Sequence, residues 1–258
     1  MNIFPTNETS SKHKLYTQLA WIYDLIYPSI FNYQEQYNII KESLQHYGIH
    51  SILEAMCGTG HLMRILESEA YSVTGLDLSQ DMLDLARRRV KGDLLLQDVR
   101  DIQTEDRFDA VVCLGRGFTY MTTDMDVMKA LRCFHRILEP DGILLLDNMR
   151  DRMFDPRGHS DWQEAVYEFD DVIIKRRRRN SMFDEENRTW RVDWVYEIKN
   201  SDETHEVKDK AVLRQFRWEQ LKEQLQDSGF RDPQIIDEKS FTVLAQALRG
   251  TSRARACS

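Results

Sequence analysis

The sequence predicts an α/β fold in which a parallel sheet is covered on both faces and is followed by an antiparallel β segment. Between residues 51 and 147, short continuous apolar runs alternate with helical segments, which is typical of parallel strands buried on both faces. After about residue 150 the apolar residues recur with a period of two, as antiparallel strands with one buried face require.

The first part of the chain begins with helices and continues with five strands. Residues 13–47 are expected to be helical, because Leu15, Leu19 and Ile22 recur at helical spacing. The expected strands are 51–55, 71–77, 94–96, 108–114 and 143–147, of which 94–96 is a short buried strand. The expected helices between them are a segment through Leu62 and Leu66, residues 80–90 and residues 126–138. Ser79 is the expected cap of the helix over 80–90, and a turn at 139–142 is expected to close the helix over 126–138.

The second part of the chain is expected to insert antiparallel strands before the core resumes. Residues 190–198 alternate between apolar and charged side chains, and residues 164–178 and 205–216 show the same pattern. Turns are expected at 180–187 and 200–204. A helix over 218–228 ended by Gly229, closing strands over 235–238 and 241–248, and a disordered tail from residue 250 complete the expected elements.

Composition and charge narrow the function classes. The 258 residues are 41% hydrophobic, enough for one sizeable core. The formal net charge of -8 argues against a nucleic-acid partner. No apolar segment reaches the ~18 residues of a membrane span and no signal segment is recognised, so a cytoplasmic protein without a membrane partner is expected. The four cysteines lack metal-ligand spacing, which predicts reduced thiols and no metal site.

Residues suited to a nucleoside cofactor follow the first three expected strands. Gly58 and Gly60 allow the backbone to approach a ligand closely and begin a helix whose N-terminal amides face that ligand. Asp77 ends the second strand, where a carboxylate can accept both hydroxyls of a ribose, and Asp98 follows the third strand, where it suits an adenine amino group. Each residue alone has a structural explanation, but the series in this order predicts a nucleoside-containing cofactor.

These residues carry a resemblance to class I S-adenosylmethionine-dependent methyltransferases. Residues 51–60 resemble their first motif, residues 73–83 their ribose-binding motif, and residues 138–144 the turn before their fifth strand. The resemblance covers about residues 15–150 and implies S-adenosylmethionine as the cofactor. It also implies a Rossmann-like sheet in the order 3-2-1-4-5-7-6, with the seventh strand antiparallel. NAD is disfavoured, because the third glycine of its fingerprint would fall at Met63.

The resemblance also implies which residues contact the cofactor. They are Tyr16, Tyr23, Glu54, Ala55, Gly58, Gly60, Asp77, Leu78, Met82, Asp98, Val99 and Leu114. The chain departs from the family at Met56, where Gly or Ala is usual. We expect this longer side chain to point away from the methionyl end of the cofactor.

Shorter stretches resemble small-molecule N-methyltransferases. Residues 111–118 and 146–150 look like the corresponding parts of glycine and sarcosine N-methyltransferases, and residues 16–24 resemble the segment that closes over the cofactor in small-molecule enzymes, including those acting on amino sugars. The resemblance therefore implies a small-molecule acceptor, with an amine nitrogen as the methylated atom. The glycine enzymes carry a substrate-contacting Asn where this chain has Arg116, which argues against glycine itself.

Four residues are candidates for the acceptor side, namely Tyr23, Arg116, Asn148 and His159. Transfer from a sulfonium requires a nucleophile held in line with the methyl group and exclusion of water, and a neutral amine needs no strong base. Arg116 would favour an anionic or carbonyl-bearing acceptor. Tyr16 and Tyr23 lie seven residues apart on an expected helix, so simple packing between them is an equal alternative.

The basic run 175–179 has two interpretations. As a nucleic-acid site it would need one continuous patch, but on a strand its charges alternate between two faces. We therefore expect cross-strand ion pairs on a solvated face, with acidic partners drawn from Glu164, Glu168, Asp170, Asp171, Asp184, Glu185 and Glu186.

The expected organisation is a helical cap over 1–50, a cofactor-binding core over 51–155, a β lid over 160–216, the C-terminal part of the core over 217–249 and a tail over 250–258. The apolar stripe of the lid needs a partner surface, which is either the pocket with the N-terminal helix or the same stripe of a second subunit in a homodimer. Rival functions are O-methyl transfer to a carboxylate or hydroxyl, RNA methylation, and a binding protein that has lost catalysis.

Overall fold

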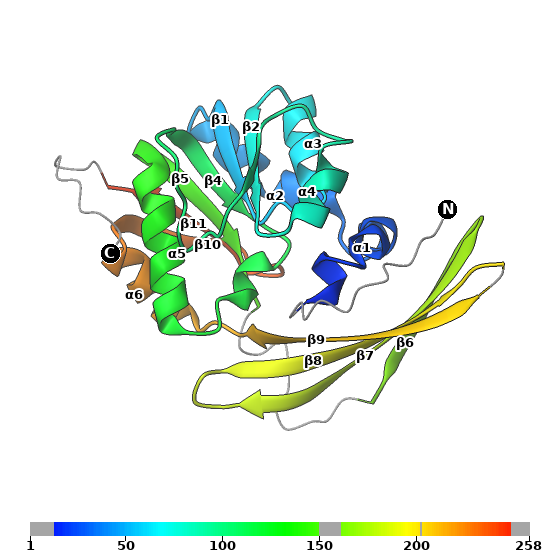
Figure 1. The fold of residues 1–258 in the computed structure, drawn as a ribbon. Coiled ribbons are helices and arrows are strands. Elements are labelled where there is room, and N and C mark those ends of the chain that lie inside the picture. The colour runs from blue at the N-terminus through cyan, green and yellow to red at the C-terminus, as the bar shows by residue number, and fades with distance from the viewer. Residues whose placement is uncertain (1–12, 150–160, 202, 249–258) are drawn as a thin grey trace.

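The structure, a computed structural model, describes residues 13–149, 161–201 and 203–248. Seven strands form its larger sheet: β1 (Ser51–Ala55), β2 (Ser72–Asp77), β3 (Leu94–Leu96), β4 (Phe108–Cys113), β5 (Leu138–Asp147), β10 (Phe230–Asp237) and β11 (Thr242–Ala247). Their order is β10-β11-β5-β4-β1-β2-β3 (Figure 1). The neighbouring strands β3, β2, β1, β4 and β5 pair in parallel. Strand β11 is antiparallel to both of its neighbours, β5 and β10. The predicted fold class, with the order 3-2-1-4-5-7-6, is confirmed.

Helices cover both faces of the larger sheet. On one face, α2 (Tyr33–His46) and α3 (His61–Ser68) pack on side chains such as Ile52 and Val112. On the other face, α5 (Asp124–Ile137) and α6 (Trp218–Asp227) pack on side chains such as Leu53 and Val111. Successive residues of one strand thus enter opposite cores, which explains the continuous apolar runs.

Several predicted boundaries in the first part of the chain were wrong. α4 (Gln80–Ala86) ends before Val90, because the amides of Arg88 and Arg89 bond to carbonyls only three residues back and tighten the last turn. α5 begins at Asp124 because Thr123 caps it. The residues expected to form a turn at 139–142 lie within β5 as a bulge: Leu138 pairs with Phe108 and Ile143 with Ala110, and Asp141 between them has φ +66°. β3 is an edge strand, so Leu96 is exposed rather than buried.

The N-terminal segment before Pro28 is divided into short helices rather than one continuous run, and a separate helix follows Pro28 as expected. It consists of η1 (Lys14–Tyr16), α1 (Ala20–Ile26) and η2 (Tyr27–Ser29) before α2. Thr17 has φ −125° and ψ −103°, which is not helical, and Pro28 supplies no N–H at the start of η2. Tyr16 and Tyr23 therefore do not share a helix, contrary to the sequence-based expectation.

The insertion after β5 is a four-stranded antiparallel sheet. Its strands, in the order in which they pair, are β6 (Gln163–Phe169), β7 (Val172–Asp184), β8 (Thr189–Lys199) and β9 (Thr204–Arg214). Residues 164–178 form a hairpin instead of one strand, since the chain turns at Asp170 and Asp171, a residue type that favours turns. β7 also continues through most of the turn expected at 180–187, because it pairs with β8 as far as Asp184.

The last two strands have different starting points from those predicted. β10 begins at Phe230, five residues before the expected start, and a register shift between Arg231 and Gln234 accommodates Pro233. β11 matches the expected position to within one residue at each end. The predicted tail from residue 250 lies outside the described residues.

The apolar stripe of β8 packs against the chain's own N-terminal segment. Trp190, Val192, Trp194, Tyr196 and Ile198 are all buried in one cluster with Leu15, Leu19, Ile22, Ile26 and Tyr27. Figure 1 shows the N-terminal helices between the antiparallel sheet and the rest of the molecule. Two partner surfaces were expected for the stripe, namely the pocket with the N-terminal helix or the same stripe of a second subunit. In the structure the stripe packs on the N-terminal segment of its own chain. No helix among the described residues is long and apolar enough to span a membrane.

This packing predicts a large difference between two substitutions in α1. Ile22 is 0% exposed and Leu25 is 39% exposed. We expect Ile22→Ala to lower the free energy of unfolding by about 2–5 kcal/mol, because it leaves a cavity between two layers. Leu25→Ala, the matched control, should change it by less than about 1 kcal/mol. Urea unfolding followed by tryptophan fluorescence measures both, and equal losses would contradict the packing.

Candidate active site

Asp77 joins the loops that follow β1 and β2. Its carboxylate accepts hydrogen bonds from the backbone amides of Gly58 and Ser79, both at 2.9 Å. Burial raises the pKa of Asp77, while these amides oppose the rise. Because each oxygen of an ionised carboxylate has two lone pairs, both oxygens retain acceptor capacity for the hydroxyls of a ligand.

The loop after β1 packs tightly against the end of α4. Gly60 has φ +77°, a conformation that side chains disfavour, and a Cβ here would lie 3.1 Å from Val90 and 3.2 Å from Ala86. The glycine lets the loop approach α4 closely and directs the first amides of α3 toward the ends of the strands. This close contact explains why glycine occupies the position.

Glu54 is a buried carboxylate with an unused oxygen. It lies in β1 with 5% exposure, and Oε2 has no hydrogen-bond partner among the described residues. Burial raises the pKa of Glu54 well above its usual range, and the negative charge of Asp77 adds to the rise. An unpaired buried carboxylate is costly, so a bound group that donates hydrogen bonds or carries positive charge would stabilise this site.

The Met56 side chain lies against the loop after β4. Its sulfur is 4.0 Å from the sulfur of Cys113, and a Cβ on Gly117 would come within 2.8 Å of it. Met56 itself has φ +60°. Methionine is therefore accommodated in this left-handed position because Gly117 leaves room for its side chain.

The other predicted cofactor residues differ in exposure. Ala55, Met82 and Val99 are buried, and Leu114 is partly buried. Leu78 is 66% exposed, which is unusual for an apolar side chain beside Asp77. These five roles remain predictions.

Asp98 already has a strong partner. Both of its oxygens accept hydrogen bonds from the guanidinium of Arg100, at 2.6–3.1 Å. These bonds lower the pKa of Asp98 although burial opposes them. A contact with an adenine amino group would therefore have to use the remaining lone pairs of this carboxylate, and that role remains a prediction.

The N-terminal segment covers the loops after β1 and β2. The Ser79 hydroxyl donates a hydrogen bond to the carbonyl oxygen of Tyr16. The ring of Tyr23 lies 3.9 Å from the position of a Cβ on Gly58 and stacks on Tyr27 at 4.0 Å between centroids. The rings of Tyr16 and Tyr23 also pack edge to face at 5.8 Å. Tyr16 and Tyr23 thus pack against each other and also cover the loops. Packing of the two rings is therefore compatible with a contact to the cofactor, which remains a prediction.

Asp24 anchors the N-terminal segment that covers these loops. Its carboxylate lies 3.0 Å from Nε2 of His61 and 3.0 Å from the guanidinium of Arg89, which also donates to the carbonyl of Thr59. Burial raises the pKa of Asp24, but the hydrogen bonds with His61 and Arg89 outweigh it and hold the pKa well below its usual range. The ion pair fixes α1 to α3 and to the turn after α4.

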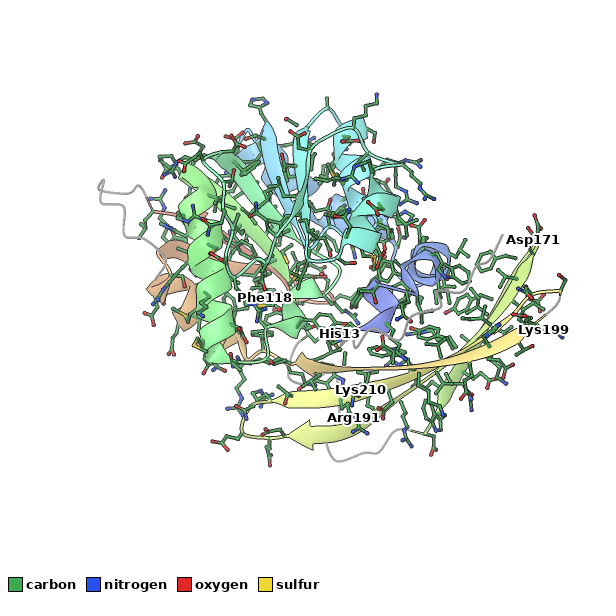
Figure 2. The ribbon with its side chains drawn as sticks, in the orientation of Figure 1. His13, Phe118, Asp171, Arg191, Lys199 and Lys210 are labelled. Carbon is green, nitrogen blue, oxygen red and sulfur yellow. The ribbon has the colours of Figure 1, made fainter. Side chains whose placement is uncertain are left out.

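A second group of aromatic contacts joins the N-terminal segment to η3 (Gly117–Tyr120). The hydroxyls of Tyr16 and Tyr120 are 2.6 Å apart. The ring of His13 lies edge to face with Tyr120 at 5.5 Å, and Figure 2 shows His13 between Phe118 and the antiparallel sheet. Sequence analysis did not predict a role for His13, because a lone histidine before a helix gives no pattern.

Asp147 fixes the loop that carries Arg116. Its carboxylate accepts from the amides of Gly115 at 3.0 Å and Arg116 at 2.7 Å, and Arg116 has φ +65°. Burial raises the pKa of Asp147 to about 7, while these amides oppose the rise. Asn148 is fully buried, and neither polar atom of its side chain has a partner among the described residues. His159 lies outside the described residues.

The basic run divides between the two faces of β7, as predicted. Lys175 pairs with Glu164 at 2.9 Å, Arg177 with Glu206 at 3.2 Å and Arg179 with Asp193 at 3.5 Å. Of the acids expected as partners, the described ion pairs of this run use Glu164 alone; Asp193 lies on the neighbouring strand β8, and Glu206 lies on β9, beyond β8. Arg176 and Arg178 face the opposite way, toward the N-terminal segment, which the expectation of one solvated face missed.

The raised pKa of Asp147 predicts how pH affects stability. Its folded pKa of about 7 exceeds the ordinary 3.8, so the folded chain binds this proton more tightly and its stability falls as pH rises between these values. Asp147→Asn cannot lose a proton. We therefore expect its unfolding free energy, relative to the parent, to increase from about pH 5 to about pH 8 in urea titrations.

A control for this experiment is Asp109→Asn. Burial raises the pKa of Asp109, but hydrogen bonds from Ser51 and His50 lower it below the ordinary value. Its stability difference from the parent should therefore stay constant above about pH 5. A constant difference for Asp147→Asn as well would refute the assigned pKa.

Comparisons with known proteins identify the domain that carries this site. Residues 52–142 match the family model of a methyltransferase domain. A glycine/sarcosine N-methyltransferase from Aphanothece halophytica is 37% identical over 116 residues, which are 41% of this chain and 43% of that protein. A dTDP-4-amino-2,3,4,6-tetradeoxy-D-glucose N,N-dimethyltransferase from Saccharopolyspora spinosa is 27% identical over 184 residues, 70% of this chain and 71% of that protein.

The fold extends the similarity beyond the matched domain. The sugar N-methyltransferase KedS8 from Streptoalloteichus sp. has a TM-score of 0.81 at 18% identity, covering 95% of this chain and 97% of that one. The chain spans less than half the length of the glycine/sarcosine N-methyltransferases that it matches. The resemblance drawn from the sequence motifs is confirmed: residues 52–142 match a methyltransferase domain, and the chain has the fold of a solved sugar N-methyltransferase.

Proposed function

We propose that the chain binds S-adenosylmethionine and transfers its methyl group to the nitrogen of a small-molecule amine. The observation that carries the proposal is the pair of buried carboxylates at adjoining strand ends, Asp77 with its two backbone donors and Glu54 with its unused oxygen. The matched methyltransferase domain contains both residues.

The residues at these strand ends fit the parts of this cofactor. The carboxylate of Asp77 would accept the ribose hydroxyls, and the exposed side chain of Leu78 would lie against the base. Glu54 would face the positively charged end of the cofactor, where its unused oxygen and raised pKa make a cation or a donor favourable. S-adenosylmethionine supplies a methyl group that its sulfonium has already activated.

The acceptor side would work by orientation and exclusion of water. Burial raises the pKa values of Tyr16 and Tyr23 well above their usual range, and the negative charges of neighbouring tyrosines would raise them further. Both hydroxyls therefore stay protonated and serve as hydrogen-bonding groups rather than bases. An amine that arrives neutral needs only such partners, and the surrounding rings and the antiparallel sheet would keep water away. A lid role for residues 160–216 is part of this proposal.

The nitrogen acceptor is favoured over oxygen by the relatives, which are named as N-methyltransferases. An O-methyltransferase that acts on a hydroxyl would need a base near the acceptor, and the tyrosines are unsuited to that role. An RNA substrate is disfavoured because the basic run is divided between two faces of a strand.

A direct assay tests the reaction. We expect label from S-adenosylmethionine to appear on at least one small primary or secondary amine in a panel of amines, carboxylic acids, alcohols and RNA. Mass spectrometry of the product identifies the methylated atom. Label on oxygen alone, on RNA alone, or on none of the panel would contradict the proposal.

A single substitution tests the cofactor site. Asp77→Ala should weaken binding of S-adenosylhomocysteine by about 1–3 kcal/mol in calorimetry, because two ribose hydroxyls lose their buried acceptor. Asp84→Ala, at an exposed position of α4 outside the motif, is the control and should bind as the parent does. Unchanged affinity in a folded Asp77→Ala protein, or tight binding of NAD by the parent, would refute this assignment.

A further inference from the structure

The two inward-facing arginines of β7 lie on the same face as the buried stripe of β8. In the antiparallel register, Arg176 is opposite Tyr196 and Arg178 is opposite Trp194. Directly opposed residues of antiparallel strands project from the same face of the sheet. Both guanidinium groups therefore extend from the sheet toward the N-terminal segment and the cofactor loops.

These two arginines differ from their neighbours in charge compensation. Lys175, Arg177 and Arg179 each form an ion pair on the outer face. Among the described residues, no carboxylate pairs with Arg176 or Arg178. The nearest candidate on the same face of β9, Asp209, accepts a hydrogen bond from the backbone amide of Leu15 at 2.9 Å.

The surroundings of Arg176 are aromatic and contain phenolic hydroxyls. The guanidinium of Arg176 lies 5.8 Å from the centre of the Tyr27 ring. The hydroxyl of Tyr196, the residue directly opposite, interacts with the side chains of Arg176 and Tyr27, and neither of these groups is acidic at neutral pH. Tyr196 is completely buried. Hydroxyl groups do not neutralise a guanidinium charge, so a partly buried arginine without a counter-ion is unfavourable unless a ligand supplies one.

A third arginine contributes to the same positive region. Burial lowers the pKa of Arg178, and the positive charges of Arg176 and Arg116 lower it further. Arg116 comes from the loop after β4, where Asp147 holds its backbone. Three arginines from two sheets thus concentrate like charge, which costs free energy in the absence of an anion.

The region also adjoins the cofactor loop. Tyr27, which contacts Arg176, stacks on Tyr23, and Tyr23 in turn lies against Gly58. A ligand held by the arginines would therefore lie beneath the antiparallel sheet and close to the loop that we assign to the cofactor.

We propose that the acceptor carries an anionic group, a phosphate or a carboxylate, and that Arg176 and Arg178 bind this group. The inference rests on the proposed methyl transfer, for which it names the acceptor class as an amine with an anionic substituent. Guanidinium groups suit both anions, because their planar donors can form paired hydrogen bonds with two oxygens. The anion would fix one end of the acceptor, and its amine would point toward the methyl group.

Anion binding tests the proposal without relying on catalysis. The protein saturated with S-adenosylhomocysteine is titrated with inorganic phosphate and, separately, with acetate, and binding is followed by calorimetry. We expect at least one anion to bind the parent, and Arg178→Met or Arg176→Met to weaken it by about tenfold or more. The anion that binds more tightly distinguishes a phosphate from a carboxylate acceptor.

Arg177→Met is the matched control, since it removes an arginine from the same strand but from the outer face. It should bind the anion as the parent does, and Arg178→Lys should keep part of the affinity because the charge remains. Binding of S-adenosylhomocysteine should be the same in all variants, which also shows that they are folded. Failure of both anions to bind, or an equal loss in Arg177→Met, would overturn the proposal.

A second measurement separates this inference from the proposed function. O-phosphoethanolamine is compared with ethanolamine, and β-alanine with its amide, as acceptors. We expect the anionic member of one pair to be preferred and the preference to fall about tenfold in Arg178→Met. If neither pair is methylated but the anion still binds through Arg178, the anion site stands and methyl transfer to these amines does not. Equal use of both members with an unchanged Arg178→Met would overturn the inference.

Discussion

The antiparallel sheet is stabilised by burial of one apolar face, and the N-terminal segment provides the surface that buries it. Four strands with an uncovered stripe of tryptophan, tyrosine and aliphatic side chains would be poorly stable in water. Leu15, Ile22, Ile26 and Tyr27 close that stripe. Because α1 is also held to the core by Asp24, the same contacts place the sheet across the carboxyl ends of the parallel strands. The attachment of the antiparallel sheet to the core therefore depends on this one packing interaction, and so does the lid role that we propose for it.

Enclosure in turn explains the electrostatics of the site. Glu54, Asp77 and Asp147 lie at or near strand ends where burial raises each carboxyl pKa. Two of them, Asp77 and Asp147, are compensated by backbone amides from neighbouring loops. Glu54 and the two inner arginines of β7 have no such compensation within the described residues. These groups of opposite sign suit the two ligands that we propose, a cationic cofactor beside Glu54 and an anionic acceptor beside the arginines.

Much of the fold follows from local sequence patterns. Apolar runs such as 51–55 and 143–147 predict parallel strands because each residue there is buried by one face or the other. The misses occur where long-range contacts override local signals. Residues 139–142 contain Pro140 and Gly142, which favour a turn, yet pairing of Leu138 with Phe108 and of Ile143 with Ala110 makes them a bulge within β5. The hairpin at Asp170 and Asp171 was missed because alternation continues through both of its strands.

The sequence by itself determined the fold class, the order of the parallel strands through the family motifs, and the acidic and glycine residues at their ends. These features depend on period, turn chemistry and chain order, which are local. Only the tertiary structure decided which surface covers the β8 stripe and that Asp24 anchors α1. It also decided that Arg176 and Arg178 face inward with no acidic partner in the described part of the chain, while Arg177 faces outward with one. The alternation of a strand separates its two faces, but which face becomes the interior depends on the element that packs against it, and that element lies far away in the sequence.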